Sequence, residues 1–193
     1  GHDVLYHNTG KGKFEDVTEA AGLGTSDVRW GSGCAFVDFN LDGKLDLFVA
    51  NYLQFDMKNT PTPDSPGACK WKGQPVMCGP RGLKGGLNRL FRNDSQPGKI
   101  HFTDVSKESG ILKPGERFSL SVTTLDYDHD RWPDIYVAVD SQASILYHNN
   151  HDGTFTDKGL ESGVAYSEDG REQAGMGTAA GDCGRRRCRR PTR

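Results

Sequence analysis

Two short runs of aspartates are the part of this sequence best suited to chemistry. Both carry oxygen-bearing side chains at positions 1, 3, 5 and 9, which are Asp38, Asn40, Asp42 and Asp46 in the first loop (residues 38–46) and Asp126, Asp128, Asp130 and Asp134 in the second loop (residues 126–134). This spacing, with the backbone carbonyl at position 7 (Lys44 or Trp132), lets a short loop curl around one hard cation. Ca²⁺ fits best, because it accepts about six to eight oxygen ligands in flexible geometry.

An EF-hand is the competing interpretation of these loops, and two features argue against it. Position 12 of an EF-hand holds a bidentate Glu, whereas the two loops have Val49 and Val137 there. A β-type run also follows each loop, where an EF-hand needs a helix. The other alternative is an acidic turn without metal, which would leave four close oxygen ligands to repel one another. The second loop has Arg131 in place of the Gly that eases the bend at position 6.

The loops recur because the chain contains an internal repeat. Three segments share a Leu, an aromatic residue, a basic residue and Asn, and they start at Leu5, Leu90 and Leu146. In each, a shared Phe precedes a shared Gly by eight residues, the pairs being Phe14 and Gly22, Phe102 and Gly110, and Phe155 and Gly163. Such a register indicates a repeat architecture and has to be found before a fold is assigned.

Short apolar runs bounded by Gly, Asn and Asp predict four strands in each unit, such as GCAFVDF, LDLFVANY, RLFRN and HFTDV. Four short strands per unit are typical of a propeller blade. We therefore expect an all-β fold, a partial β-propeller with two complete four-stranded blades at residues 30–106 and 118–158 and two partial blades at 4–18 and 175–181. Because a propeller closes with about four to eight blades, the sequence is expected to be part of a longer one.

Residues 1–182 are predicted to form this propeller segment, interrupted by a Pro-, Gly- and Lys-rich insertion loop at 56–86. Within the insertion, a disulfide between Cys69 and Cys78 would stabilise the fold by roughly 2.7 kcal/mol in an oxidising compartment. Two free thiols are the alternative. Cys34 lies in an apolar strand and is expected to be a small buried side chain.

The last eleven residues, 183–193, are expected to be an unstructured or frameshifted tail. They contain six Arg, whereas residues 1–181 carry 18 basic and 25 acidic groups, a net charge of −7. The repeat would place another Asp-Gly-Asp loop after Asp182, and Gly-Asp-Gly codons read one base out of frame encode successive Arg residues. We therefore expect no nucleic-acid partner, although an Arg-rich tail on its own suggests one.

At these residues the sequence resembles the FG-GAP (VCBS-type) β-propeller repeats of integrin α subunits, and more closely the cartilage acidic protein and ASPIC/UnbV branch. The motifs that carry the resemblance are LYHN with FEDVTEAAGL, WGSGCAFVDFNLDGKLDLFVANY, CGPRGLKGGLNRLFRN, FTDVSKESGI and AGMGTAAGD. The sequence departs from the family at the Phe-Gly pair that names the repeat, which is Trp30-Gly31 in the first whole blade and Phe118-Ser119 in the second.

The resemblance implies a calcium-bound propeller used for adhesion or protein–protein interaction outside the cytoplasm, whether secreted, on the cell surface or in the periplasm. It implies two Ca²⁺ ions, held at the ten loop positions named above. The expected ligand is an unidentified extracellular protein or glycan, and no membrane span is expected.

No catalytic residues are expected, because the Ser, His and Asp residues form no recognisable nucleophile motif. His7 and His148 occupy the same repeat position, where the third unit has Arg92, and this favours a structural role over acid–base chemistry. The alternative function is a propeller domain of a secreted carbohydrate-active enzyme of the polysaccharide lyase type.

Overall fold

The computed structural model describes residues 3–24, 30–56, 58, 69–76, 79–80 and 82–181. This part of the chain contains fifteen strands and no helix, so the all-β prediction is confirmed. In the same residues, no helix has the length and apolarity that a membrane crossing requires. The predictions for Asp182, the tail 183–193 and Cys78 lie outside the described residues.

The first large sheet contains the four strands predicted for the first whole unit. They are β3 (Gly31–Val37), β4 (Asp46–Asn51), β9 (Arg89–Asn93) and β10 (Phe102–Asp104), in the order β10-β9-β4-β3. All neighbours are antiparallel, and β4 is buried along its whole length. The first loop connects β3 to β4.

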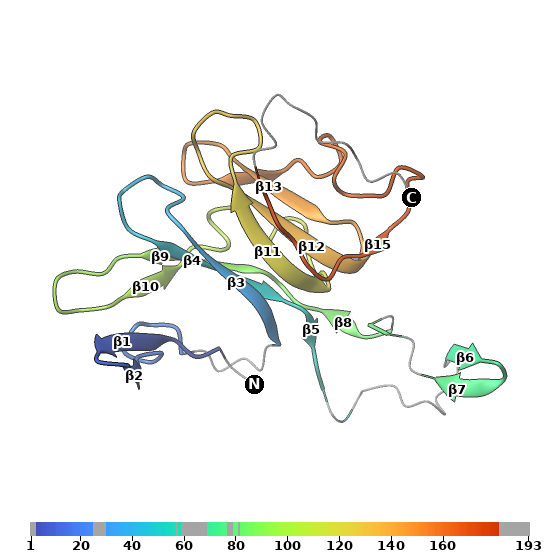
Figure 1. Cartoon of the computed structure of the whole chain (residues 1–193), viewed down its shortest axis with the longest axis horizontal. Helices are drawn as coiled ribbons and strands as arrows, with labels where there is room; N and C mark the ends of the chain where they lie inside the picture. The colour runs from blue at the N-terminus through green and yellow to red at the C-terminus, as the bar shows by residue number, and fades with distance from the viewer. Residues whose placement is uncertain are drawn as a thin grey trace.

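The second large sheet repeats this order. Its strands are β11 (Ser119–Leu125), β12 (Asp134–Gln142), β13 (Ile145–Asn149) and β14 (Phe155–Asp157), again antiparallel and consecutive in space. The second loop connects β11 to β12, so the two aspartate loops occupy the same place in the two sheets. Figure 1 shows the second sheet above the first, with β3 and β11 side by side.

The predicted strand at 175–181 is wrong, because residues 175–181 form no strand. Instead β15 (Gln173–Ala174) joins the second sheet, where Ala174 pairs with Asp140 of β12. The reason is that β12 extends to Gln142, whereas its ladder with β13 ends at Val137. The part of β12 beyond that ladder pairs with β15.

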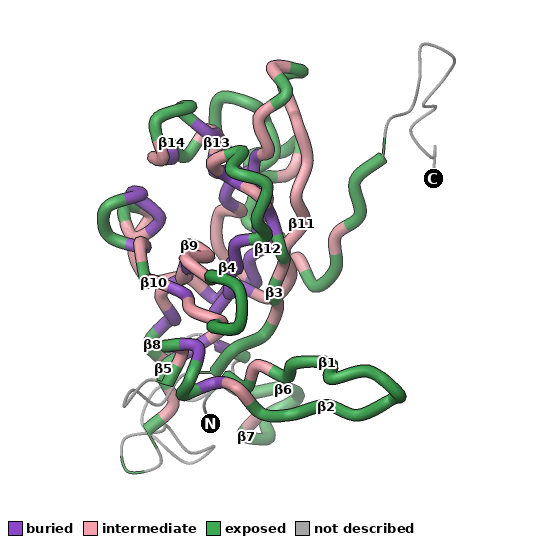
Figure 2. The backbone as a smooth tube through the Cα atoms, turned by 90° about the vertical axis from the view of Figure 1, so that its left-hand side faces the viewer, coloured by how far each residue is buried: buried purple, intermediate pink, exposed green. Residues whose placement is uncertain are grey.

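The N-terminal unit and the insertion form smaller hairpins. β1 (Tyr6–Gly10) pairs with β2 (Lys13–Asp16), and both strands are exposed along their length (Figure 2). At the base of the insertion, β5 (Leu53–Gln54) pairs with β8 (Lys84–Gly85). This pairing closes the insertion at the edge of the first unit.

Farther out, the insertion contains a tight hairpin of β6 (Cys69–Trp71) and β7 (Gln74–Val76). Lys72 and Gly73 join the strands with φ values of 49° and 80°, the pattern of a two-residue type I′ turn. Cys69 is the first residue of β6. Its predicted disulfide partner lies outside the described residues, so that disulfide stays a prediction.

The main core lies between the two large sheets. Its fully buried side chains come from both sheets and from the segment between β10 and β11, and they include Phe48, Leu90, Ile111, Ile135, Tyr147 and Phe155. Aromatic rings join the layers, since the ring centroids of Phe48 and Tyr147, and of Phe39 and Phe155, are each 5.8 Å apart. Burying one such side chain contributes about 1.5–3 kcal/mol, so this interface is the main source of cohesion.

Cys34 is exposed, contrary to the prediction that it is buried. It lies on β3, the edge strand of the first sheet, where Phe36 is also 49% exposed. Both residues border a cavity of about 430 Å³ that Val4, Leu5 and neighbouring residues also line. An apolar run indicates a strand, but it does not determine whether a second layer covers each face.

Successive units contact one another through the shared Phe and Gly of the repeat. The N–H of Phe102 donates to Ala21, and that of Phe155 donates to Ser109, each the residue before a shared glycine. Gly22 and Gly110 have φ values of 79° and 80°, and a Cβ atom on either would lie 3.0 Å from the carbonyl oxygen of that same Phe. The recurring spacing of Phe and Gly therefore sets the packing of one unit on the next.

Candidate metal centre

The two aspartate loops share one hydrogen-bonded frame. At position 1, the carboxylate of Asp38 accepts hydrogen bonds from the backbone N–H groups of Asp42 (3.0 Å) and Gly43 (2.9 Å). In the second loop, Asp126 accepts the equivalent pair at 3.1 and 3.0 Å. These bonds close each loop while leaving lone pairs on both carboxylate oxygens.

The carboxylates at position 9, Asp46 and Asp134, have no exposed surface. In each, one oxygen accepts from the N–H of position 2, at 3.1 Å in the first loop and 3.0 Å in the second. The other oxygen accepts from the backbone N–H of Asn93 (2.7 Å) or Asn149 (2.9 Å), on the third strand of the same sheet. Position 9 therefore ties each loop to its sheet.

Burial dominates the electrostatics of these two acids. It raises the pKa of Asp46 to about 6, although the backbone N–H groups of Asn93 and Phe39 act in the opposite direction. Burial also raises the pKa of Asp134 above its ordinary value. A cation held in either loop would favour the carboxylate form and offset this cost.

Both loops bend through left-handed backbone at the same two positions. At positions 4 and 6, φ is 56° and 83° in the first loop (Leu41 and Gly43), and 65° and 74° in the second (His129 and Arg131). A left-handed residue other than Gly costs roughly 1–2 kcal/mol. Arg131 thus adopts the bend that its side chain disfavours, and the missing Gly does not alter the loop geometry.

The structure adds two positioning residues that the sequence analysis missed, Asn93 and Asn149. The side-chain amide of Asn93 donates to the carbonyl of Leu45 at 2.9 Å. That of Asn149 donates to Pro133 at 3.2 Å and, across the sheets, to Phe39 of the first loop at 2.8 Å. The available signal was the Asn shared by all three repeats, which marks the strand that supports each loop.

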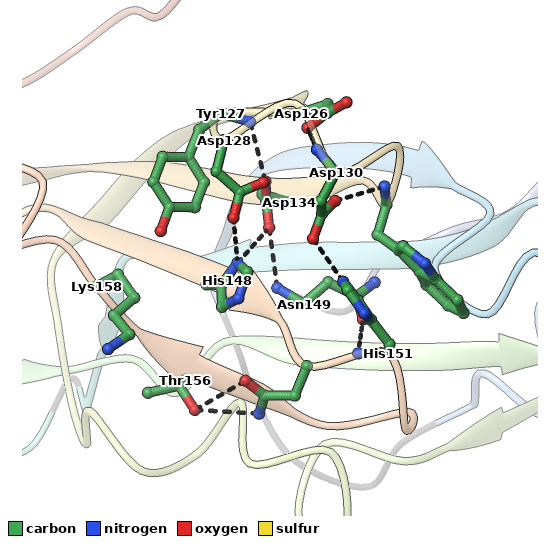
Figure 3. Close-up of polar contacts among 12 residues, drawn as sticks. Asp126, Tyr127, Asp128, Asp130, Asp134, His148, Asn149, His151, Thr156 and Lys158 are labelled. Atoms are coloured by element: carbon green, nitrogen blue, oxygen red, sulfur yellow. Dashed lines mark hydrogen bonds and ion pairs between the residues drawn. The ribbon is translucent and has the colours of Figure 1, made fainter.

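Among the described residues, groups of three His, Cys, Asp or Glu ligand atoms occur only at the second loop. Those of Asp126, Asp128 and Asp130 lie within 4.8 Å of one another, and so do those of Asp128, Asp134 and His148. Figure 3 shows His148 below the carboxylates of Asp128 and Asp134. The predicted carboxylates of the first loop share the frame but form no such group. At position 7 of the two loops, the backbone N–H of Lys44 or Trp132 donates to the carboxylate at position 5.

Histidines contact the carboxylates of the second loop. His148 Nδ1 lies 3.2 Å from Asp134 Oδ1 and 3.6 Å from Asp128 Oδ2. His151 Nε2 contacts Asp130 Oδ2, and its ring stacks on Trp132. The N–H of Trp132 and the imidazole of His151 lower the pKa of Asp130. The role of these imidazoles was not predicted.

The first loop has no such partner. Within the described part of the chain, no Lys, Arg or His nitrogen lies within 4.0 Å of the carboxylates of Asp38, Asp42 or Asp46. Arg92, at the repeat position of His148, instead binds Asp94 through two bonds of 2.8 and 3.0 Å. This pairing lowers the pKa of Asp94 to about 2.

The sequence is similar to one repeat family and to several known proteins. A family model for the FG-GAP-like repeat matches residues 1–49. Cartilage acidic protein 1 from Homo sapiens is 27% identical over 136 residues, which are 70% of this chain and 15% of that protein. The proteins of the same name from Mus musculus and Xenopus tropicalis are each 26% identical, over 136 and 137 residues, each match covering 70% of this chain and 16% of that protein. The chain thus spans under a fifth of the length of these relatives. The matches confirm that it resembles FG-GAP-like repeat proteins of the cartilage acidic protein branch.

Proposed function

We propose that this chain is a segment of an extracellular β-propeller that binds calcium and serves adhesion or protein–protein interaction. The observation that carries the proposal is the frame shared by the two aspartate loops. Five backbone hydrogen bonds recur at equivalent positions in the two loops, although the residues between the shared aspartates differ. An accidental acidic turn would have no reason to repeat so closely.

Calcium is proposed for the first loop because its side-chain donors are all oxygens. Asp42 is exposed and Asp38 and Asn40 are half-buried, whereas Asp46 is buried, and burial raises its pKa. Hard oxygen ligands suit Ca²⁺, and a divalent cation would offset both the mutual repulsion and the cost of the buried carboxylate. The sequence predicts calcium in the second loop as well, but the imidazoles there lead to a different proposal below.

The propeller assignment is supported by the two large sheets. Each has the strand order expected of a four-stranded blade, and the shared Phe and Gly link each unit to the next. We propose that the two sheets are neighbouring blades and that the N-terminal hairpin belongs to a preceding one. The ring would be completed by blades that the described residues do not contain.

A binding role is proposed in preference to catalysis. The relatives are named for cartilage, which favours a location outside the cell. Trp71 on the insertion hairpin is 64% exposed, with the Lys72 ammonium 4.5 Å from its ring centroid. An exposed aromatic beside a cation is suited to contacting a protein or glycan surface.

Calcium titration of the full chain tests the proposal, with calorimetry or terbium luminescence as the readout. Wild-type protein is expected to bind calcium at the first loop, and Asp42→Ala is expected to abolish that binding. Asp152→Ala is the matched control, because Asp152 is an exposed carboxylate in a turn outside both loops. If the dissociation constant is about 10 μM, millimolar calcium should add about 2.7 kcal/mol to the free energy of unfolding. Binding that survives Asp42→Ala unchanged would contradict the proposal.

A further inference from the structure

We propose that the second loop binds a borderline transition-metal ion of the Zn²⁺ class, through Asp128, Asp134 and His148, while the first loop is the calcium site. The two loops would then present the same frame to different metals. This inference rests on the proposed function only in treating the loop frame as a cation site. It does not require calcium to bind at the first loop.

The ligand atoms have the spacing that such an ion needs. Zn²⁺ forms bonds of about 2.0–2.2 Å to imidazole nitrogen and carboxylate oxygen, so tetrahedral ligands lie about 3.4 Å from one another. His148 Nδ1 is 3.2 Å from Asp134 Oδ1 and 3.6 Å from Asp128 Oδ2. An ion placed between them would take the place of the proton between the imidazole and the carboxylates, and water or another loop oxygen would complete the coordination.

The imidazole decides between the metals. Calcium is bound in proteins by oxygen ligands, whereas imidazole nitrogen is a preferred ligand of Zn²⁺ and its neighbours in the first transition series. His148 reaches the loop from β13, outside the aspartate run, and its ring meets the ring of Tyr127 edge-on at 5.5 Å. A group supplied by a second strand and held by an aromatic contact is an observation independent of the acidic cluster.

The surrounding contacts fix the ligands in place. Asp134 is oriented by the backbone N–H groups of Tyr127 and Asn149. His151 contacts Asp130 and stacks on Trp132 with ring centroids 4.8 Å apart and planes 18° apart. His151 thus occupies one Asp130 oxygen, while His148 contacts Asp128 and Asp134. Outer contacts of this kind orient metal ligands and raise affinity.

The first unit provides the internal comparison. Arg92 stands at the repeat position of His148, and its guanidinium has no lone pair to offer a metal. Its guanidinium is also bound by Asp94 and forms no ion pair within 4.0 Å with the carboxylates of the first loop. The residue at this one position therefore separates an all-oxygen loop from a loop with a nitrogen ligand.

The experiment titrates the full chain with Zn²⁺ in the presence of millimolar Ca²⁺, and with Co²⁺ as a spectroscopic probe. Wild-type protein is expected to bind one Zn²⁺ that calcium does not displace, and to give a Co²⁺ ligand-field spectrum with nitrogen coordination. His148→Arg, which installs the residue of the first unit, is expected to weaken Zn²⁺ binding by about 100-fold or more. His148→Gln is a second variant of smaller charge change, and a cooperative urea unfolding transition reports whether each variant is folded.

His7→Arg is the matched control, since His7 occupies the same repeat position on the exposed hairpin β1–β2. It should leave Zn²⁺ affinity unchanged, and so should Asp42→Ala. Three results would overturn the inference. They are an equal loss of Zn²⁺ affinity in His7→Arg, unchanged Zn²⁺ binding in both folded His148 variants, and displacement of Zn²⁺ by millimolar calcium. Loss of calcium binding at the first loop with Zn²⁺ binding intact would defeat the proposed function and leave this inference standing.

Discussion

The two large sheets repeat one another to the level of single hydrogen bonds, yet their aspartate loops face different partners. Both loops are closed by position 1 and anchored by position 9. The first faces an arginine that is already paired with Asp94, and the second faces two histidines. The comparison teaches that the loop sequence sets the frame, whereas a residue on the third strand of the sheet sets which side chain meets the carboxylates of the loop.

The largest effect should come from removing the anchor of either frame. Asp46→Ala or Asp134→Ala would leave two backbone N–H groups without their carboxylate acceptor, at about 1–3 kcal/mol each. We expect the free energy of unfolding to fall by about 3 kcal/mol in urea titrations with chelator present. Asp42→Ala, at an exposed position, should cost under about 1 kcal/mol. If the anchor variants cost no more than Asp42→Ala, position 9 does not hold the frame.

A smaller loss of stability should separate two costs of a methyl group at a shared glycine. One cost comes from the close contact between units, and the other comes from the positive φ of the backbone. Gly110 and Gly163 both have positive φ, but a Cβ atom would lie 3.0 Å from the Phe155 carbonyl at Gly110 and meet nothing within 4 Å at Gly163. Gly163→Ala should therefore cost about 1 kcal/mol and Gly110→Ala roughly 1–3 kcal/mol more. Thermal or urea unfolding of the pair gives the difference directly. Equal losses would mean that the packing of one unit on the next tolerates a methyl group.

The smallest effect concerns the Arg92–Asp94 pair, in which the carboxylate of Asp94 binds the guanidinium that faces the first loop. The pKa of Asp94 is lowered from 3.8 to about 2, so its stabilising contribution is present above about pH 4 and is lost as the pH falls through 2. Because the pair is partly exposed, we expect at most about 1 kcal/mol. The difference in unfolding free energy between wild type and Asp94→Asn should shrink between pH 5 and pH 2. A difference that stays constant over this range would contradict the assignment.

The strand runs and the loop spacing could be predicted from the sequence because both are local patterns. Alternating apolar residues between Gly and Asp located all eight strands of the large sheets, and the Asp positions located both loops. Long-range contacts could not be predicted in this way. The exposure of Cys34 depends on which layer covers β3, and the pairing of β15 depends on the length of β12.

The role of His148 shows the same limit at the candidate site. Its repeat position, shared with His7, favoured a structural role. Only the antiparallel pairing of β12 with β13 brings its ring beneath Asp128 and Asp134. His148, the residue that distinguishes the two loops, therefore lies 14 positions from Asp134, the nearest loop carboxylate. The spacing rules for metal-binding loops do not extend that far along the chain.

The contact between each shared glycine and the Phe of the next unit also bears on how the chain unfolds. Because these contacts join only neighbouring units, the coupling is that of a one-dimensional array, in which a unit flanked on both sides is held more firmly than one at an end. Among the described units, the β1–β2 hairpin is exposed along both strands. Hydrogen exchange in this chain should therefore begin at β1–β2 and reach β4 and β12 last, so that the molecule frays unit by unit rather than opening at once.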